Sequence, residues 1–410
     1  MIARARAVLS SDRRIAALLG ALALVLYVGP AIGHPTVFDY FGRLAVAVTF
    51  GRVWLDGAPP HLDELVPGVG GHLYHEVPPL IAILLIPFTS FGTTAQIQTV
   101  ASAIIGALAT VPMYLSLRAL AVPRPLSIWC TALSSFGTAL WISAVDGRSW
   151  FAADAAAVLF GSTALWLAAS GRSFLLVGAA LGIGSLARTP LVLAAPGLLL
   201  LARRDVEPFA ALARRAALLV AGGLPFAFVQ LGYNALRFGD PLQMGYGIRT
   251  DPNNFVNRGL LSVSYIPRHL YAIFFEPPFY VDEPPFYIRA RSFGMGLFTS
   301  TPALLWLAKT ATDARHARPV LPLALSAVLV FLPNLLFATT GFEQYGYRRV
   351  LDAQSFVIPL LAFGAGWTGA AWRASGSLLF RVAVVSSVCI TLYFLLEIRL
   401  FGYIPGHQIR

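Results

Sequence analysis

The sequence predicts an all-α polytopic membrane protein with about eleven transmembrane helices. Apolar residues make up 57% of the 410-residue chain and charged residues only 12%, whereas soluble proteins carry roughly 25% charged residues. Apolar runs near the roughly 20 residues needed to cross a bilayer recur along the whole chain. Basic residues gather mainly in every second connection between these runs. We therefore expect one integral-membrane domain over residues 1–410.

Eleven apolar runs account for the expected spans. The first run could be a secretory signal peptide, but its length and the adjacent Asp39 favour a membrane anchor. The segment 77–88 is bounded by prolines and is about half a membrane thick, so we expect a re-entrant or interfacial helix there. The runs cover residues 15–33, 96–117, 126–145, 151–169, 174–187, 191–202, 216–233, 295–307, 320–338, 350–369 and 378–397.

The distribution of basic residues supports this choice of spans. With a cytoplasmic N-terminus and no crossing at 77–88, sixteen basic residues fall inside, and six fall in the short outer connections and the C-terminal tail. A crossing at 77–88 would give ten inside and twelve outside, against the positive-inside rule. The C-terminus is then expected outside. Fifteen of the 19 acidic residues and both long connections, 34–94 and 234–294, also fall outside.

The first outer connection, 34–94, opens with a carboxylate close to the hydrocarbon. Asp39 and Arg43 are spaced i,i+4, so on a helix they share a face and could form an ordinary ion pair. A charge at the membrane edge is costly unless it is used, which also makes Asp39 a candidate acid or base. His72, His75 and Glu76 follow further along, but two His spaced i,i+3 with a neighbouring Glu are weak evidence for a metal site.

Other outer residues could hold an anion. Asp154 lies about one turn into an apolar run, where it is either functional or a packing residue bonded to another helix. Arg188 lies between two short apolar segments and is either a phosphate ligand or a snorkelling interfacial residue. Tyr347, Arg348 and Arg349 open the tenth run, and two adjacent arginines there run against the positive-inside bias. An anionic ligand on the outer side would explain them.

The outer connection 234–294 adds a wall of aromatic residues and prolines. The stretch 233–293 holds 13 Phe or Tyr residues and seven Pro, which is typical of an interfacial aromatic belt and also suits a lipid or sugar cleft. An outer acid, arginines and an amphipathic wall fit a lipid-phosphate substrate. The short inner turns have no Gly-rich phosphate loop for a nucleotide, and no nucleic-acid-binding motif is present.

These segments together resemble the GT-C glycosyltransferases, in particular the protein mannosyltransferase and aminoarabinose-transferase-like bacterial membrane proteins. The order of the motifs is more specific than any one of them. They cover most of residues 39–204 and return at 341–364. The motifs are "FDYFGRLAVAVTFGRVWLDG", "VPPLIAILLIPF", "WFAADAAAVLFGSTALWLAASGR", "LGIGSLARTPLVLAAPGLLLLARR" and "YGYRRVLDAQSFVIPLLAFG".

The resemblance implies transfer of a sugar from a polyprenyl-phosphate donor to an acceptor hydroxyl on the outer face of a bacterial inner membrane, with inversion. Asp39 matches the supposed catalytic base of that family, and Asp154 matches a further acidic position. The positions expected to bind the donor phosphate are Arg188, Tyr347, Arg348 and Arg349, and those expected to contact substrate are Arg43, His75, Glu76 and Asp154. The acceptor would be a glycan, a lipid or a protein.

The chain departs from the family pattern at two positions. Many members have a second acid beside the first Asp, where this chain has Tyr40, and aminoarabinose-type members have Lys where it has Val77. No cofactor is therefore implied with certainty, although a divalent cation remains possible. Two other hypotheses stay open: a lipid or sugar transporter or flippase, and a non-catalytic membrane subunit that kept the fold. A fold by itself does not give chemistry.

Overall fold

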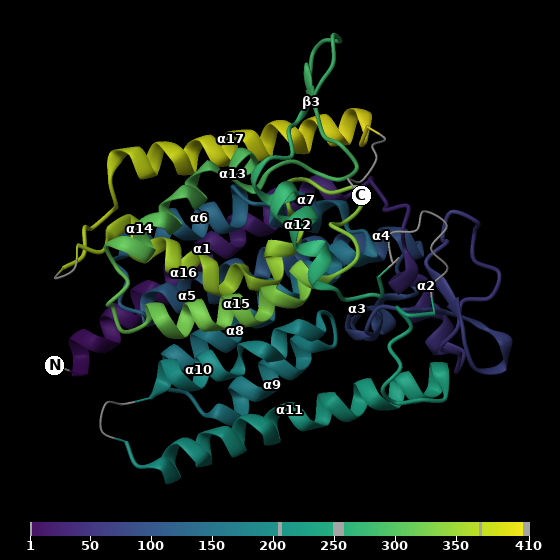
Figure 1. The fold of residues 1–410 in the computed structure, drawn as a ribbon, viewed down its shortest axis with the longest axis horizontal. Helices are drawn as coiled ribbons and strands as arrows, with labels where there is room; N and C mark the ends of the chain where they lie inside the picture. Colours follow the sequence, from purple (N-terminus) through teal and green to yellow (C-terminus); the bar gives the residue numbers. More distant parts are fainter. Residues whose placement is uncertain (1, 204–206, 249–257, 369–370, 405–410) are drawn as a thin grey trace.

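The computed structural model describes residues 2–203, 207–248, 258–368 and 371–404, and nearly all of the regular structure in them is helical. Most helices run side by side along one direction, with α17 at one flank and α11 at the other (Figure 1). The main helices are α1 (Ile2–Ala31), α4 (Thr94–Leu108), α5 (Thr110–Ala119), α6 (Arg124–Phe136), α7 (Ala139–Asp146), α8 (Ser149–Ala169), α9 (Phe174–Ser185), α10 (Ala195–Ala202), α11 (Phe209–Phe238), α15 (Val320–Leu336), α16 (Gln354–Gly366) and α17 (Leu378–Phe401).

The apolar helices make the chain a multi-pass membrane protein. Five helical stretches in the described residues are long and apolar enough to cross a bilayer: Ser11–Ala31, Thr94–Ala119, Ser149–Ala169, Phe209–Phe238 and Leu378–Phe401. A sixth span is possible where α6 and α7 meet at a 44° bend. The other predicted spans correspond to shorter or broken helices, so the number eleven stays a prediction.

Local sequence explains where the predicted runs break. The run 126–145 is interrupted because Thr138 caps α7, accepting a hydrogen bond from the backbone N–H of Leu140 at 3.3 Å. The run 295–307 is divided into α13 (Leu297–Ser300) and the 3₁₀ helix η5 (Pro302–Trp306), followed by α14 (Leu307–Thr312). Pro302 has no backbone N–H to continue the first of these helices.

Helix α8 forms the centre of the bundle and packs against α4, α5, α7, α9 and α16. Its central residues are mostly alanine, glycine and serine, which allow neighbouring helices to approach closely. Helix α11, in contrast, contacts mainly α9. A Cβ added at Gly178 of α9 or at Gly222 of α11 would lie 1.9 Å from a backbone oxygen of the other helix, so glycine is required along this seam.

The two long connections form smaller elements. The first contains α2 (Tyr40–Thr49), β1 (Leu65–Pro67), η1 (Val69–Gly71), β2 (Leu73–His75), α3 (Leu80–Leu85) and η2 (Ile86–Phe88), and β1 pairs antiparallel with β2. The second contains η4 (Val263–Tyr265), α12 (Ile266–Phe274), β3 (Phe279–Tyr280) and β4 (Ile288–Arg289), with β3 and β4 in an antiparallel hairpin. Helices α2 and α3 and the last turn of α11 lie at one end of the bundle, which we call the loop end, and α1 begins at the opposite end (Figure 1).

Candidate functional site

Asp39 lies immediately before α2 and is 2% exposed. One carboxylate oxygen accepts a hydrogen bond from Arg43 Nε at 2.7 Å, and the other accepts one from the hydroxyl of Thr94. The ion pair that the i,i+4 spacing allowed is therefore present. The approach of α2 to α4 that makes the Thr94 contact possible needs Gly42, because a Cβ there would lie 2.3 Å from the Thr94 carbonyl oxygen.

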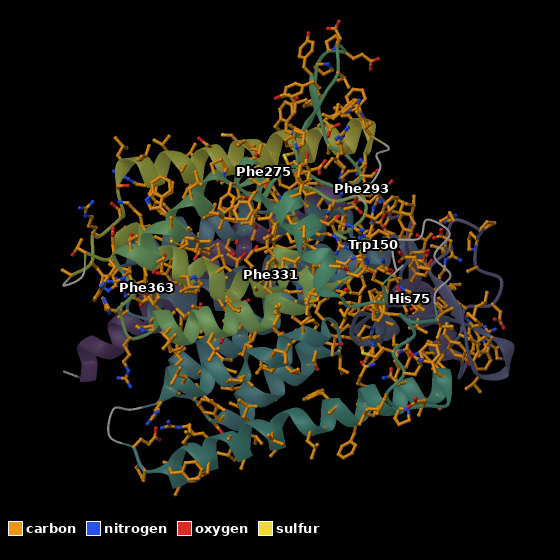
Figure 2. All side chains as sticks on the ribbon, in the orientation of Figure 1. His75, Trp150, Phe275, Phe293, Phe331 and Phe363 are labelled. Carbon is orange, nitrogen blue, oxygen red and sulfur yellow. The ribbon has the colours of Figure 1, made fainter. Side chains whose placement is uncertain are left out.

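Phe38, the residue before Asp39, links the backbone of this segment to the start of α8. The Phe38 carbonyl oxygen accepts hydrogen bonds from the backbone N–H of Ser149 at 3.2 Å and from its hydroxyl at 2.9 Å. The Phe38 ring packs against Trp150, with ring centroids 4.9 Å apart. Trp150 and His75 both lie towards the loop end (Figure 2). The first turn of α8 thus fixes the backbone that carries Asp39.

About one turn further along α8, Asp154 is fully buried and ion-paired. One oxygen accepts a hydrogen bond from Arg348 Nη1 at 2.7 Å, and the other lies 3.4 Å from Arg188 Nε. The Arg348 guanidinium also lies over the Phe151 ring, at 5.4 Å from its centroid. Asp154 therefore joins α8 to the two segments that carry Arg188 and Arg348.

Arg188 forms a bidentate ion pair with Asp352, a residue of the 3₁₀ helix η6 (Arg348–Ala353). Arg188 Nε and Nη2 donate to the two Asp352 oxygens at 2.8 and 2.7 Å. Asn334 of α15 donates to the same carboxylate at 2.8 Å, and its amide oxygen accepts from Arg188 at 3.3 Å. Paired N–H bonds of this kind hold a guanidinium in one orientation.

Arg349 has a different set of partners, and all of those described are neutral. Its donors reach the Asn334 amide oxygen at 3.2 Å, the Thr339 hydroxyl at 3.1 Å and the Thr340 carbonyl oxygen at 3.2 Å. The guanidinium also lies 4.5 Å from the centroid of the Phe337 ring. Arg349 is 6% exposed, so this charge is buried without a carboxylate in contact.

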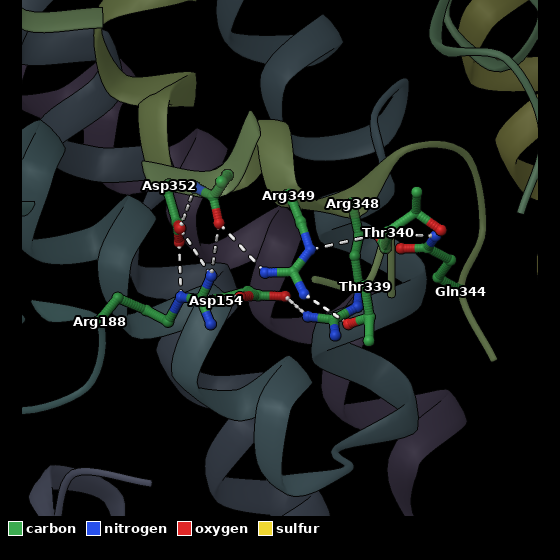
Figure 3. A network of polar contacts seen from close by, with 9 residues as sticks. Asp154, Arg188, Thr339, Thr340, Gln344, Arg348, Arg349 and Asp352 are labelled. Carbon is green, nitrogen blue, oxygen red and sulfur yellow. Dashed lines mark hydrogen bonds and ion pairs between the residues drawn. The ribbon is translucent and has the colours of Figure 1, made fainter. Parts of the chain in front are cut away.

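These contacts form one network, drawn in Figure 3, that joins α8, α15, η6 and the turn before the 3₁₀ helix η3 (Thr189–Ala194). It contains three guanidinium groups, Arg188, Arg348 and Arg349, and two carboxylates, Asp154 and Asp352. Three positive and two negative charges leave a surplus of one positive charge. A buried charge without a counter-ion is costly, so the network is suited to an anion.

Tyr347 lies beside this network but bonds elsewhere. Its hydroxyl lies 2.5 Å from His269 Nδ1, and His269 Nε2 lies 2.7 Å from the Phe337 carbonyl oxygen. Since Nε2 must donate to that carbonyl, Nδ1 accepts the Tyr347 proton. Burial lowers the pKa of His269 to about 4, with Arg349 and Arg268 acting in the same direction. The neutral imidazole therefore orients the Tyr347 ring.

His75 and Glu76 lie between the Asp39 segment and α11. The His75 ring stacks on Tyr40, with centroids 4.4 Å apart and planes 2° from parallel, and its carbonyl oxygen accepts from Arg237 at 2.5 Å. Burial and then Glu76 raise the pKa of Tyr246 to about 12, whereas Arg188 and Arg237 act to lower it.

The structure brings four predicted residues into one network: Asp154 contacts Arg188 and Arg348, and Arg349 joins them through Asn334. Asp39 and Arg43 form a separate pair, and no contact between them and the network occurs among the described residues. Two residues of the network, Asp352 and Asn334, were missed from the sequence, and so was Arg237 beside His75. Asp352 could have been found, because it follows Arg348 by four residues inside an apolar run.

Two further features bear on ligands. Within the described part of the chain, no group of three or more His, Cys, Asp or Glu is placed to hold a metal ion. A small cavity of about 10 Å³ is lined in part by Thr138, Ser300, Tyr347 and Gln354, which is about the space of one water molecule. This cavity is far too small for a lipid headgroup.

The fold is similar to that of solved oligosaccharyltransferases. The crystal structure of the Archaeoglobus fulgidus oligosaccharyltransferase in the apo form matches 96% of this chain and 56% of that one, with a TM-score of 0.55 and 15% identity. The oligosaccharyltransferase AglB from Archaeoglobus fulgidus, in complex with an inhibitory peptide and a dolichol-phosphate, matches the same shares with a TM-score of 0.53 and 14% identity. This chain thus spans little more than half the length of these proteins.

No protein-family model and no curated relative matches the sequence. The two structural comparisons confirm the predicted GT-C fold. They do not distinguish the narrower mannosyltransferase and aminoarabinose-transferase-like family from other proteins with this fold. The activity and the roles of individual residues do not follow from a fold at this level of identity.

Proposed function

We propose that this protein is a membrane glycosyltransferase that moves a sugar from a polyprenyl-phosphate donor to an acceptor hydroxyl, with inversion, on the outer face of a bacterial inner membrane. The observation that supports this best is the buried network with one surplus positive charge, at Asp154, Arg188, Arg348, Arg349 and Asp352. In this proposal the loop end, with connections 34–94 and 234–294, faces outward.

Arg349 is the strongest phosphate ligand of the three arginines. Arg348 is neutralised by Asp154, and Arg188 is neutralised by Asp352. Within the described ranges Arg349 contacts only neutral groups, so an anion that approaches it does not have to displace a carboxylate. A sugar phosphodiester carries a single negative charge, which equals the surplus. Tyr347 would lie beside the same phosphate without donating to it, because its only hydroxyl proton goes to His269.

Asp39 is the proposed base. Arg43 and Thr94 each donate to one of its oxygens, and each carboxylate oxygen keeps a second lone pair for the acceptor hydroxyl. The hydroxyl oxygen attacks the anomeric carbon as its proton passes to Asp39, and the bond from that carbon to the phosphate oxygen breaks. The electron pair leaves with the polyprenyl phosphate, whose charge the arginines stabilise.

The partner classes follow from the same proposal. The donor is a polyprenyl-phosphate-linked sugar, and the acceptor is a glycan, a lipid or a protein. The structural neighbour AglB was solved with a dolichol-phosphate and an inhibitory peptide, which supports a lipid-phosphate donor here. His75 and Glu76 would contact substrate from the first connection.

The test uses the full chain in proteoliposomes with a panel of polyprenyl-phosphoryl sugars. Asp39→Asn should slow transfer about 10²–10⁴-fold, because it removes a general base, while binding of the lipid phosphate is retained. Arg349→Gln should weaken lipid-phosphate binding. Asp282→Asn and Arg172→Gln change exposed residues and serve as controls. Full transfer by Asp39→Asn would show that Asp39 is not the base, and unchanged binding by Arg349→Gln would remove the phosphate assignment.

A further inference from the structure

Helix α11 carries four polar residues on one face near its loop end. Gln230, Tyr233, Asn234 and Arg237 are spaced i, i+3, i+4 and i+7, so they form a single stripe, which we call the α11 stripe. Elsewhere on this part of the helix large apolar side chains are exposed, as at Phe228, 63% exposed. Polar residues in membrane helices face the protein interior and often mark substrate paths.

The stripe is buried and held in place by its own hydrogen bonds. Arg237 is 0% exposed and Tyr233 is 8% exposed. The Asn234 amide oxygen accepts from Gln230 at 2.8 Å and from Arg237 at 2.7 Å. The Arg237 guanidinium lies 4.0 Å from the centre of the Tyr233 ring and 4.7 Å from that of Phe238. These side chains therefore have fixed positions.

Three buried polar atoms of the stripe nevertheless have no hydrogen-bond partner among the described residues: Gln230 Oε1, the Tyr233 hydroxyl and Arg237 Nε. A buried polar group without a partner costs about 1–3 kcal/mol, so such groups are rare unless a ligand or water completes them. The three atoms are an acceptor, a group that both donates and accepts, and a donor. A phosphate only accepts hydrogen bonds at neutral pH, whereas sugar hydroxyls do both.

The stripe also contacts the connection that joins the two halves of the proposed site. Arg237 donates to the His75 carbonyl oxygen, and the His75 ring stacks on Tyr40, the neighbour of Asp39. The same connection also reaches the turn that carries Arg188, because the backbone N–H of Leu80 donates to the Leu186 carbonyl oxygen at 2.9 Å. A sugar in transfer has to lie between the base and the phosphate, and the stripe borders the connection that links the two.

We propose that the α11 stripe is a sugar subsite, in which Gln230, Tyr233 and Arg237 bind hydroxyl groups of the donor sugar. This inference rests on the proposed function, because it takes the donor phosphate to lie at the arginine network. It assigns recognition of the sugar to α11 and recognition of the phosphate to Arg349. The two ligand parts can therefore be tested with separate variants.

The experiment compares bare polyprenyl phosphate with polyprenyl-phosphoryl glucose, mannose and arabinose, and measures the affinity of each for the full chain in nanodiscs. Wild type should prefer one glycosylated lipid over the bare phosphate about tenfold, the value of one or two net hydrogen bonds. Tyr233→Phe removes only a hydroxyl and should lower that preference about fivefold, with unchanged affinity for bare polyprenyl phosphate. Gln230→Leu should act in the same direction.

Tyr280→Phe is the matched control, since Tyr280 is 69% exposed on the hairpin, and it should behave as wild type. Equal affinity of wild type for the bare and all glycosylated lipids overturns the subsite, and so does a full preference in both Tyr233→Phe and Gln230→Leu. Failure of wild type to bind any of these lipids overturns the proposed function itself. The two failures are therefore distinguishable.

Discussion

Removal of the Asp352 carboxylate should lower the free energy of unfolding of the protein. Asp352 is 0% exposed and accepts three hydrogen bonds, from Arg188 at 2.8 and 2.7 Å and from Asn334 at 2.8 Å. Loss of one partner from a buried ion pair costs about 3–5 kcal/mol. In a variant without this carboxylate, Arg188 keeps a second counter-ion, Asp154, whose oxygen lies 3.4 Å from Arg188 Nε. For Asp352→Ala we therefore expect the lower end, about 3 kcal/mol.

The assay is reversible unfolding of the full chain in mixed micelles, titrated with sodium dodecyl sulfate. The double variant Arg188→Met, Asp352→Leu removes both members of the pair and leaves the net charge of the network unchanged. It should recover most of the lost stability, because apolar residues often replace a buried pair without cost. Asp282→Ala, at an exposed position, should change stability by less than about 0.5 kcal/mol.

The reasoning fails if Asp352→Ala costs less than about 1 kcal/mol, the value typical of an exposed pair. It also fails if the double variant loses as much as the sum of the two single variants. Additivity would mean that Arg188 and Asp352 stabilise the protein independently. The bidentate geometry and complete burial of Asp352 predict strong coupling instead.

Two further predictions use the same titration. Gly222→Ala should destabilise the protein by about 2 kcal/mol through overpacking, since the added Cβ would lie 1.9 Å from the Leu175 carbonyl oxygen. Gly232→Ala is the control: no atom lies within 4 Å of its Cβ, so it should stabilise the protein by up to about 1 kcal/mol. A gain of stability in both variants would show that the packing of α9 on α11 adjusts to the added methyl group. The pKa of His269 falls from 6.5 to about 4 on folding, so the unfolded chain binds the proton first as pH falls, and about 3 kcal/mol should be lost between pH 6.5 and 4. His269→Phe should remove this part of the pH dependence, and an unchanged profile would place the effect elsewhere.

The sequence was sufficient for the class of fold and for much of the helix order. Composition and apolar runs identify a membrane protein because lipid demands helices with satisfied backbones. Breaks inside runs were harder to place, since the kink before α7 depends on one capping threonine, Thr138. The region 295–307 reads as continuous and apolar, yet Pro302 divides it into short helices.

Candidate residues were predicted where a charge was out of place in the sequence. Asp154, Arg188, Arg348 and Arg349 all lie near or inside apolar runs, and the structure brings them into one network. Which arginine is neutralised by which carboxylate could not be predicted. That depends on long-range contacts between α8, η6 and α15, and Asp352 was read as part of an apolar span.

The pattern of ion pairs in the network shows which of its three arginines carries the unmatched charge. A purely structural cluster would be expected to balance its charges, because each unmatched ion in a buried site is costly. Here two carboxylates neutralise Arg188 and Arg348, while Arg349 is held by amide, hydroxyl and carbonyl oxygens. Neutral acceptors orient a guanidinium without cancelling its charge, so Arg349 stays attractive to an incoming anion. We therefore regard Arg349, rather than the better-paired Arg188, as the residue whose loss should most directly affect binding of a lipid phosphate.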